Sequence, residues 1–161
     1  MKENLENINH KLVLIVLVGP PGSGKSTWGK KFAQDHNLNY ISTDELRARF
    51  GSGEDDQTVS GAVFGYVKRI IPQLLSTGKS VLIDATSMSR RDRKDYIKFA
   101  DAVGAYKIAI AFEVDRNTLI KRNQERGEKG GRNVPVEVID RFLGKYQRPD
   151  SSEGFDKVVI K

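Results

Sequence analysis

The chain has 161 residues, a length typical of one domain that buries roughly 70% of its unfolded surface. With 38% hydrophobic and 30% charged residues, its composition is that of a globular protein and excludes a disordered or membranous one. It has no cysteine, which excludes disulfides and thiolate metal sites. We expect a single domain over residues 1–161, with a polar N-terminal extension over 1–11, no targeting segment and a cytoplasmic location.

The net charge of +6 is unevenly distributed along the chain. Residues 1–85 carry 10 Lys and Arg against 9 Asp and Glu, whereas residues 86–161 carry 17 against 12. A basic C-terminal half favours a polyanionic partner, although an excess of this size is also typical of solvated surface.

The first half of the chain alternates apolar runs with helical patterns. In chain order we expect a strand at 12–18, a helix at 24–35, a strand at 38–43, a helix at 44–50, a loop at 51–57, a helix at 58–76 and a strand at 80–84. The run Leu12 to Val18 is apolar throughout, which is typical of a central strand buried on both faces. The helix over 58–76 keeps its apolar spacing despite Pro72. Gly61 and Gly65 in it allow a close approach, either by a neighbouring helix, which is the simpler interpretation, or by an acceptor strand.

The second half continues the alternation. We expect a helix from Ser89 to about Gly104, a strand at 106–113, a helix from Asp115 to about Arg126, a loop at 127–134, a helix from Pro135 and a strand at 156–160. This order predicts one α/β domain with a parallel sheet. Ligands of such sheets bind beyond the carboxyl ends of the strands, which is where Gly19, Asp44, Asp84 and Asp115 fall.

The sequence Gly19-Pro20-Pro21-Gly22-Ser23-Gly24-Lys25-Ser26 directly follows the first strand and matches G-x-x-x-x-G-K-[ST]. Glycines let the backbone curl so that N–H groups point at a triphosphate, and the following helix adds positive potential. Lys25 is then expected to reach the β- and γ-phosphates and Ser26 to ligate Mg²⁺. The chain therefore binds a nucleoside triphosphate, and the open question is what receives the phosphate.

Two carboxylates follow the next strands. Asp44 is placed to accept a proton from an attacking hydroxyl, and Arg47 one turn later to grip an anionic group of the acceptor. The same residues also fit a plain helix start in which Ser42 and Glu45 form a capping box. Asp84 ends an apolar strand and is a candidate for orienting Mg²⁺ or its water shell, with capping of the next turn as the alternative.

Basic residues cluster between Leu119 and Arg132, where the segment carries a net charge of +3. Arg122 and Arg126 are four residues apart, so both project from one face of a helix. Together with the following loop they predict a basic lid over about 122–134 that closes on a triphosphate and supplies an arginine finger. The alternative is a solvated helix end, where arginines also favour the helix dipole.

Several segments in this order resemble the kinase domain of polynucleotide 5′-kinases of the phage and bacterial end-healing kind, over about residues 12–160. The resemblance lies in Gly19 to Trp28, Asp44-x-x-Arg47, residues 56–64, Ile83-Asp84-Ala85-Thr86, Arg122-Asn123-x-x-Arg126 and Val134-Pro135. It implies a P-loop NTPase fold with an adenylate-kinase-like three-layer domain, a central parallel sheet and a helical or loop lid. The implied activity is ATP- and Mg²⁺-dependent phosphorylation of the 5′-hydroxyl ends of DNA or RNA.

The resemblance also implies roles for individual residues. Asp44 is the general base, Lys25 and Arg126 act with it in catalysis, and Arg47 with Asp44 holds the acceptor. Mg²⁺ is held by Ser26 and Asp84. The nucleotide is bound by Gly19, Gly22, Ser23, Gly24, Lys25, Ser26, Thr27, Arg122, Arg126 and Arg132.

The chain departs from the family pattern at two points. Ser87 stands where the family often has asparagine, so a contact with the acceptor or within the fold differs there. The chain has no Asp-x-Asp-x-Thr phosphatase motif, so we expect a kinase without a fused phosphatase or ligase.

Two other functions compete with this one. A kinase of a small acceptor, such as a sugar acid, an antibiotic or a nucleotide-sugar, uses the same loop, acidic residue and basic lid. A nucleotide-gated module that binds nucleic-acid ends without phosphorylating them does not need Asp44 and Arg126, whose presence argues against it.

Overall fold

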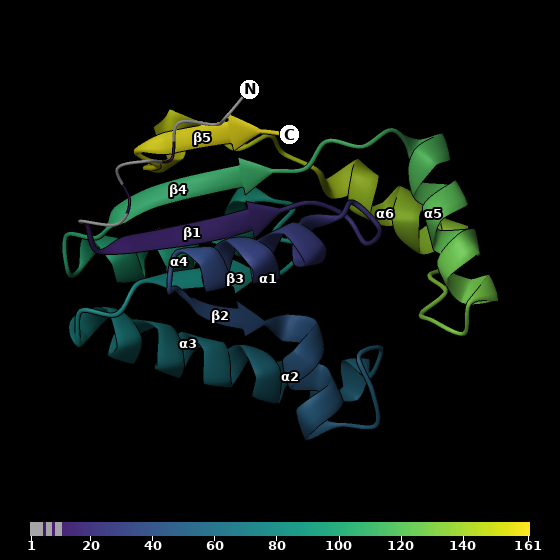
Figure 1. The fold of residues 1–161 in the computed structure, drawn as a ribbon, viewed down its shortest axis with the longest axis horizontal. Coiled ribbons are helices and arrows are strands. Elements are labelled where there is room, and N and C mark those ends of the chain that lie inside the picture. Colours follow the sequence, from purple (N-terminus) through teal and green to yellow (C-terminus); the bar gives the residue numbers. More distant parts are fainter. Residues whose placement is uncertain (1–4, 6–7, 9–10) are drawn as a thin grey trace.

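The computed structural model describes Leu5, Ile8 and residues 11–161, and its five strands form one parallel sheet in the order β2-β3-β1-β4-β5 (Figure 1). The strands are β1 (Val13–Val18), β2 (Asn39–Ser42), β3 (Val81–Asp84), β4 (Tyr106–Ala111) and β5 (Lys157–Ile160). Because all neighbours are paired in parallel, every strand ends at the same edge. The segments that follow the strands therefore meet at that edge.

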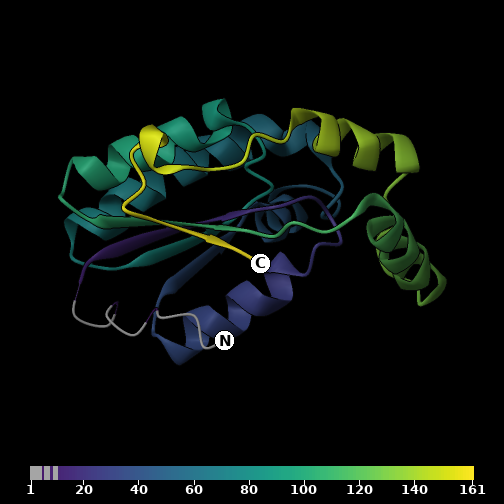
Figure 2. The ribbon, with the colours of Figure 1, turned by 90° about the horizontal axis from the view of Figure 1, so that it is seen from above.

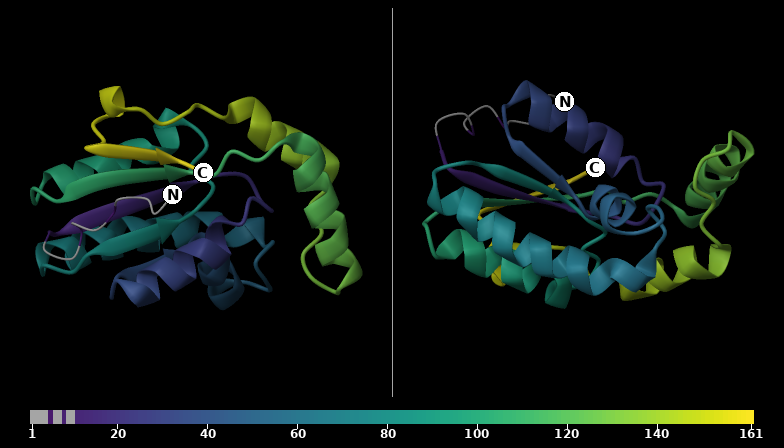
Figure 3. Two further views of the ribbon diagram at one scale, coloured as in Figure 1. Left: turned by 45° about the horizontal axis from the view of Figure 1, so that its top comes forward. Right: turned by 90° about the horizontal axis from the view of Figure 1, so that it is seen from below.

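Helices cover both faces of the sheet and extend beyond its carboxyl edge (Figure 2). They are α1 (Lys25–Asp35), α2 (Thr43–Phe50), α3 (Ser60–Ser76), α4 (Arg90–Asp101), α5 (Arg116–Glu128) and α6 (Val136–Lys145). α1 packs on one face, and α3 and α4 lie on the other (Figure 3). The expected three-layer α/β fold with a central parallel sheet is confirmed.

Strand β1 is buried on both sides because its side chains alternate between the two layers. Leu14 and Val16 face the cluster that includes Val67 and Ile71 of α3. Ile15 faces the opposite cluster beneath α1, where Trp28 and Phe32 also pack. This two-sided burial explains why the strand is apolar at every position, and it fixes the start of the following loop.

Helices α5 and α6 stand beyond the sheet and pack on each other through a small cluster of their own (Figure 1). Leu119, Val134 and Ile139 form its buried centre. The Asn123 side chain accepts a hydrogen bond from the Val134 N–H at 2.8 Å and donates to the Asn133 side chain at 3.0 Å. These bonds tie the loop after α5 back onto α5, so the predicted lid segment has a defined shape.

The predicted elements are present in the predicted order. Their observed ends differ from the predicted ends by a few residues, because the spacing of apolar residues does not show where the last hydrogen bond of a strand or helix forms. Two short 3₁₀ helices, at Gln57–Val59 and Ser151–Glu153, were not predicted. The helix-packing interpretation of Gly61 and Gly65 is wrong, because no atom of another described element lies within 4 Å of the Cβ position of either glycine.

The predicted N-terminal extension over 1–11 is described only at Leu5, Ile8 and Lys11, where Leu5 and Ile8 are buried in the cluster beneath α1. Among the described residues, none of the helices combines the length and the apolar character that crossing a bilayer requires.

Candidate active site

The loop between β1 and α1 takes the shape that its glycines allow. Gly22 and Gly24 have φ of 83° and 88°, in the left-handed region that other residues rarely adopt. Gly19 lies behind the loop, where its N–H donates to the Thr86 carbonyl at 3.0 Å, and it is not on the cavity wall. The loop therefore presents the residues from Pro21 to Thr27, and the N-terminus of α1, to a cavity at the carboxyl edge of the sheet.

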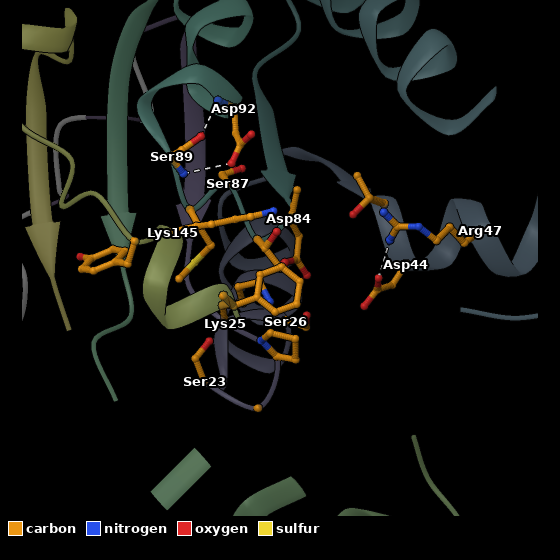
Figure 4. A pocket seen from close by; sticks show the side chains of 18 of the residues that line it. Ser23, Lys25, Ser26, Asp44, Arg47, Asp84, Ser87, Ser89, Asp92 and Lys145 are labelled. Atoms are coloured by element: carbon orange, nitrogen blue, oxygen red, sulfur yellow. Dashed lines mark hydrogen bonds and ion pairs between the residues drawn. The ribbon is translucent and has the colours of Figure 1, made fainter. Parts of the chain in front are cut away.

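That cavity has a volume of about 1480 Å³ and brings together most of the predicted site residues (Figure 4). A single small-molecule site usually measures about 300–1,000 Å³, so this cavity has room for more than one ligand. The predicted site residues on its wall are Gly22, Ser23, Gly24, Lys25, Ser26, Thr27, Asp44, Arg47, Asp84, Arg122, Arg126 and Arg132. Among these predictions, only Gly19 lies elsewhere.

Lys25 is the buried cation of the cavity, with 7% of its surface exposed. Burial lowers the pKa of its amine, and the carboxylates of Asp84 and Asp44 oppose this by raising it. The neighbouring guanidinium groups of Arg132 and Arg126 add to the lowering. A cluster of cations around a partly desolvated lysine is suited to the several negative charges of a triphosphate.

Asp44 lies at the start of α2, where only half of the expected capping box forms, because the Glu45 side chain pairs with Lys30. The Ser42 side chain caps the helix by accepting from the Glu45 N–H at 3.3 Å, while the Asp44 carboxylate faces the cavity. One carboxylate oxygen accepts from Arg47 at 2.8 Å and the other from Arg132 at 3.1 Å. The loop after α5 thus reaches across to the acidic residue that follows β2.

Asp84 at the end of β3 is buried and accepts a hydrogen bond from the hydroxyl of Tyr40 on β2. Burial, and then that contact, raise the pKa of Tyr40 well above its usual value, so the tyrosine stays a donor at neutral pH. Asp84 lines the cavity with Ser26. Oxygen ligands of this kind, one carboxylate and one hydroxyl completed by phosphate oxygens and water, suit Mg²⁺. The described residues contain no cluster of three or more His, Cys, Asp or Glu able to hold a metal.

Arg122 and Arg126 of α5 point toward the loop between β1 and α1. The Arg122 guanidinium donates to the Gly22 carbonyl at 3.4 Å, and Arg126 Nη2 lies 3.7 Å from the Cβ position of Gly22. Both side chains line the cavity, where Arg122 is exposed and Arg126 is half-buried.

Four buried side-chain atoms lack a hydrogen-bond partner among the described residues, and all four belong to the wall of this cavity. They are Ser23 Oγ, Arg47 Nε, Ser87 Oγ and Arg126 Nη2. An unsatisfied buried polar group costs about 1–3 kcal/mol, so folded proteins keep few of them. Their concentration on one wall indicates a site whose polar ligand completes these bonds.

Three residues that support the site were not predicted. Tyr40 holds Asp84, Asn123 holds the two residues that follow Arg132, and Arg93 of α4 holds the segment after Asp84. Arg93 had a signal in the sequence, because it lies three and four residues before Tyr96 and Ile97 on the buried face of its helix. A charge in such an apolar pattern indicates a buried partner. Tyr40 gave no comparable signal, and Asn123 was noted only as part of the Arg122-Asn123-x-x-Arg126 segment, without a role.

Comparison with known proteins places the chain in a family. A family model described as an AAA domain (AAA_33) matches residues 14–149. Adenylate kinase isoenzyme 1 of Sus scrofa is 30% identical over 162 residues, which cover 92% of this chain and 80% of that protein. The L-seryl-tRNA(Sec) kinase of Methanococcus maripaludis is 29% identical over 149 residues, covering 89% of this chain and 56% of that protein.

A chain in the structure of the Pnkp1/Rnl/Hen1 RNA repair complex is also similar, with 28% identity and a TM-score of 0.74. The match covers 94% of this chain and 49% of that one. This chain therefore spans only about half the length of the RNA repair chain and of the tRNA kinase. The AAA-domain match, the parallel sheet and the kinase relatives agree with one another, and the chain belongs to this AAA-domain family and has the P-loop kinase fold.

Proposed function

We propose that this protein is an ATP-dependent polynucleotide 5′-hydroxyl kinase. The observation that carries the proposal is the pair formed by Asp44 and Arg47 on the cavity wall. Asp44 offers a carboxylate, while Arg47 keeps a buried Nε donor without a partner among the described residues. A carboxylate beside an arginine that keeps one donor available suits an acceptor whose hydroxyl lies close to an anion. The 5′-terminal nucleotide of a strand, with its 3′-phosphodiester, has that chemistry.

On the donor side, the loop amides and Lys25 bind the phosphates of ATP, and Arg126 and Arg122 close over them. Ser26 and Asp84 are the residues that would hold Mg²⁺. Such an ion, when bound, neutralises charge that develops on the β- and γ-phosphate oxygens. Arg132 reaches the site from the lid segment over 122–134 and exchanges its contact with Asp44 for a phosphate contact.

In the transfer, the acceptor's 5′-oxygen forms a bond with the γ-phosphorus as its proton passes to Asp44. The bond between the γ-phosphorus and the bridging oxygen breaks at the same time, and ADP leaves with that electron pair. Arg126 stabilises the charge that spreads over the transferred group. Arg47 fixes the acceptor so that attack is in line.

The likeness to a chain of an RNA repair complex supports a nucleic-acid end as acceptor. We further propose a role in DNA or RNA end repair in the cytoplasm. A kinase of a small acceptor is the competing function, since it needs the same donor site.

The direct test incubates the protein with γ-labelled ATP, Mg²⁺ and 5′-hydroxyl DNA and RNA oligonucleotides, in parallel with gluconate, AMP, CMP and seryl-tRNA. Label on the 5′ end of the oligonucleotides is expected. Label confined to one of the other acceptors overturns the proposal in favour of a small-acceptor or tRNA kinase.

The role of Asp44 is tested with Asp44→Asn. Removing a general base lowers turnover by about 10²–10⁴-fold, while the dissociation constant for ATP stays within about threefold. Asp55→Asn is the matched control, because Asp55 also pairs with Arg132 but is not on the cavity wall. A variant of Asp44 that loses ATP binding instead of turnover contradicts the assignment.

A further inference from the structure

The cavity extends well beyond the phosphate loop, to a surface made by three other helices and the segment after β3. We call this surface the α3–α4 wall. It consists of Phe64 and Lys68 of α3, Ser87 of the segment after β3, Arg91 and Lys94 of α4, and Lys145 of α6. Figure 4 draws Ser87 and Lys145 on the side of the cavity away from Asp44 and Arg47. The roles assigned to the nucleotide and to the reacting hydroxyl use none of these residues.

Ser87 is the most constrained residue of this wall. It is 4% exposed, its Oγ has no hydrogen-bond partner among the described residues, and its φ of 47° lies in the left-handed region. Such a backbone conformation in a residue other than glycine is uncommon and costs free energy, so the surrounding structure must enforce it. Arg93 does so, because its Nη1 donates to the Ser87 carbonyl at 2.8 Å and to the Met88 carbonyl at 3.2 Å. The hydroxyl is thus held rigidly at the cavity without an internal partner.

The charge of the wall is positive. Arg91, Lys94 and Lys145 make no ion pair with any described residue, although all three line the cavity. The two carboxylates nearest in sequence are already engaged. Asp92 closes the capping box with Ser89, and Asp95 pairs with Lys68 at 3.1 Å. Three cationic side chains without an ion-pair partner among the described residues, on one concave surface, attract an extended anion.

The wall also carries an exposed aromatic ring. The surface of Phe64 is 40% exposed, which is unusual for so large an apolar residue. Gly61 and Gly65 lie beside it on α3, and the space at their Cβ positions is open. An exposed aromatic ring on the wall of the cavity is suited to stacking with a nucleobase.

We propose that the α3–α4 wall is a binding subsite for a single-stranded acceptor beyond its first nucleotide. This inference rests on the proposed function. The phosphodiester groups of the strand contact Arg91, Lys94 and Lys145 and accept a hydrogen bond from the Ser87 hydroxyl, and one base stacks on Phe64. The wall thereby selects strands over mononucleotides and small alcohols, because these short acceptors do not extend beyond Arg47 to the wall.

The test compares acceptors of different length with wild-type protein and the double variant Arg91→Ala/Lys94→Ala. The acceptors are a nucleoside 3′-monophosphate and a single-stranded 5′-hydroxyl 10-mer. For the 10-mer, KM rises about three- to thirtyfold in the variant. The slope of log(kcat/KM) against log salt becomes shallower by about 1.4, because two fewer phosphates are neutralised. For the monophosphate, KM stays within about twofold.

The double variant Lys79→Ala/Lys98→Ala is the matched control. Both lysines are exposed and neither lines the cavity, and Lys98 lies one turn after Lys94 on the same helix. The control removes the same charge and is expected to behave as wild type with both acceptors. A loss equal to that of the wall variant assigns the effect to net charge and overturns the subsite.

Binding is also measured without catalysis, as fluorescence anisotropy of the labelled 10-mer. If the wild-type protein phosphorylates the 10-mer and the wall variant does so with unchanged KM and affinity, the subsite is overturned and the proposed function stands. If the wild-type protein binds the 10-mer through the wall but labels only small acceptors, the proposed function falls, and the wall is a strand-binding surface but not an acceptor subsite. If it neither binds nor labels the strand, both fall.

Ser87→Ala separates contact with the strand from a structural role. The change deletes a hydroxyl that no described residue satisfies, so the Tm is expected not to fall, while KM for the 10-mer rises about tenfold. A lower Tm with unchanged KM makes Ser87 a structural residue and removes it from the subsite.

Discussion

A buried ion pair behind the cavity offers the sharpest test of how the fold holds its site. The Arg93 side chain is fully buried and makes a two-pronged contact with Glu153, at 2.9 Å from Nε and 2.6 Å from Nη2. It also donates to the carbonyls of Ser87, Met88 and Gln147. One guanidinium therefore joins α4, the segment after β3 and the segment that leads to β5.

The expected effect of Arg93→Met follows from the burial of its partner. The Glu153 side chain is 4% exposed, so removing the arginine leaves a carboxylate without compensation in a nearly dry site. Breaking such a pair costs about 3–5 kcal/mol. For a domain of this size, 1 kcal/mol shifts the Tm by about 2–4 °C, so the Tm falls by about 6–20 °C.

The double variant Arg93→Met/Glu153→Leu separates the charge effect from the positioning effect. Replacing both charges by apolar groups removes the uncompensated carboxylate, so at least half of the lost stability returns. Phosphorylation of the 10-mer does not return with it, because the Ser87 carbonyl has lost its anchor. The assays are thermal unfolding followed by circular dichroism, and acceptor KM.

Two results would refute this reasoning. A fall in Tm of less than about 3 °C for Arg93→Met shows that the pair adds little to the fold. A double variant no more stable than the single one shows that the stability of the site comes from the carbonyl contacts and not from pairing of the charges.

Three further predictions concern the donor side of the cavity. Tyr40→Phe deletes the hydrogen-bond donor to Asp84, so the free energy of unfolding, measured by denaturant titration, is expected to fall by about 1.5–3 kcal/mol. Tyr66→Phe is the control and is expected to be neutral, because no described residue bonds the Tyr66 hydroxyl. Burial lowers the pKa of the Lys25 amine below its ordinary 10.5. Because the charged amine binds the phosphates, kcat/KM for ATP is expected to fall as the pH rises through that lowered pKa. A profile of kcat/KM that stays flat up to pH 10.5 contradicts this prediction. Arg126→Ala lowers single-turnover rates by about 10³-fold or more without lowering the Tm, and a much smaller loss reduces Arg126 to packing in the lid.

Much of the donor site can be predicted from the sequence because its residues lie close together along the chain. The apolar run of β1, the glycines and Lys25 lie within fifteen residues, and each is required by the backbone path or by the phosphate. The alternation of strands and helices predicts a parallel sheet, and a parallel sheet brings Asp44 and Asp84 to the edge where that loop ends.

Local pattern does not encode which distant groups meet, and tertiary structure alone decided those contacts. Tyr40 reaches Asp84 across 44 residues, Arg93 reaches Glu153 across 60, and Arg132 reaches Asp44 across 88. Each depends on which strands become neighbours and how far the lid folds back, and these outcomes are set by packing of the whole core. The buried polar atoms of Ser23, Arg47, Ser87 and Arg126 that lack a partner among the described residues can be identified only once the tertiary contacts are known.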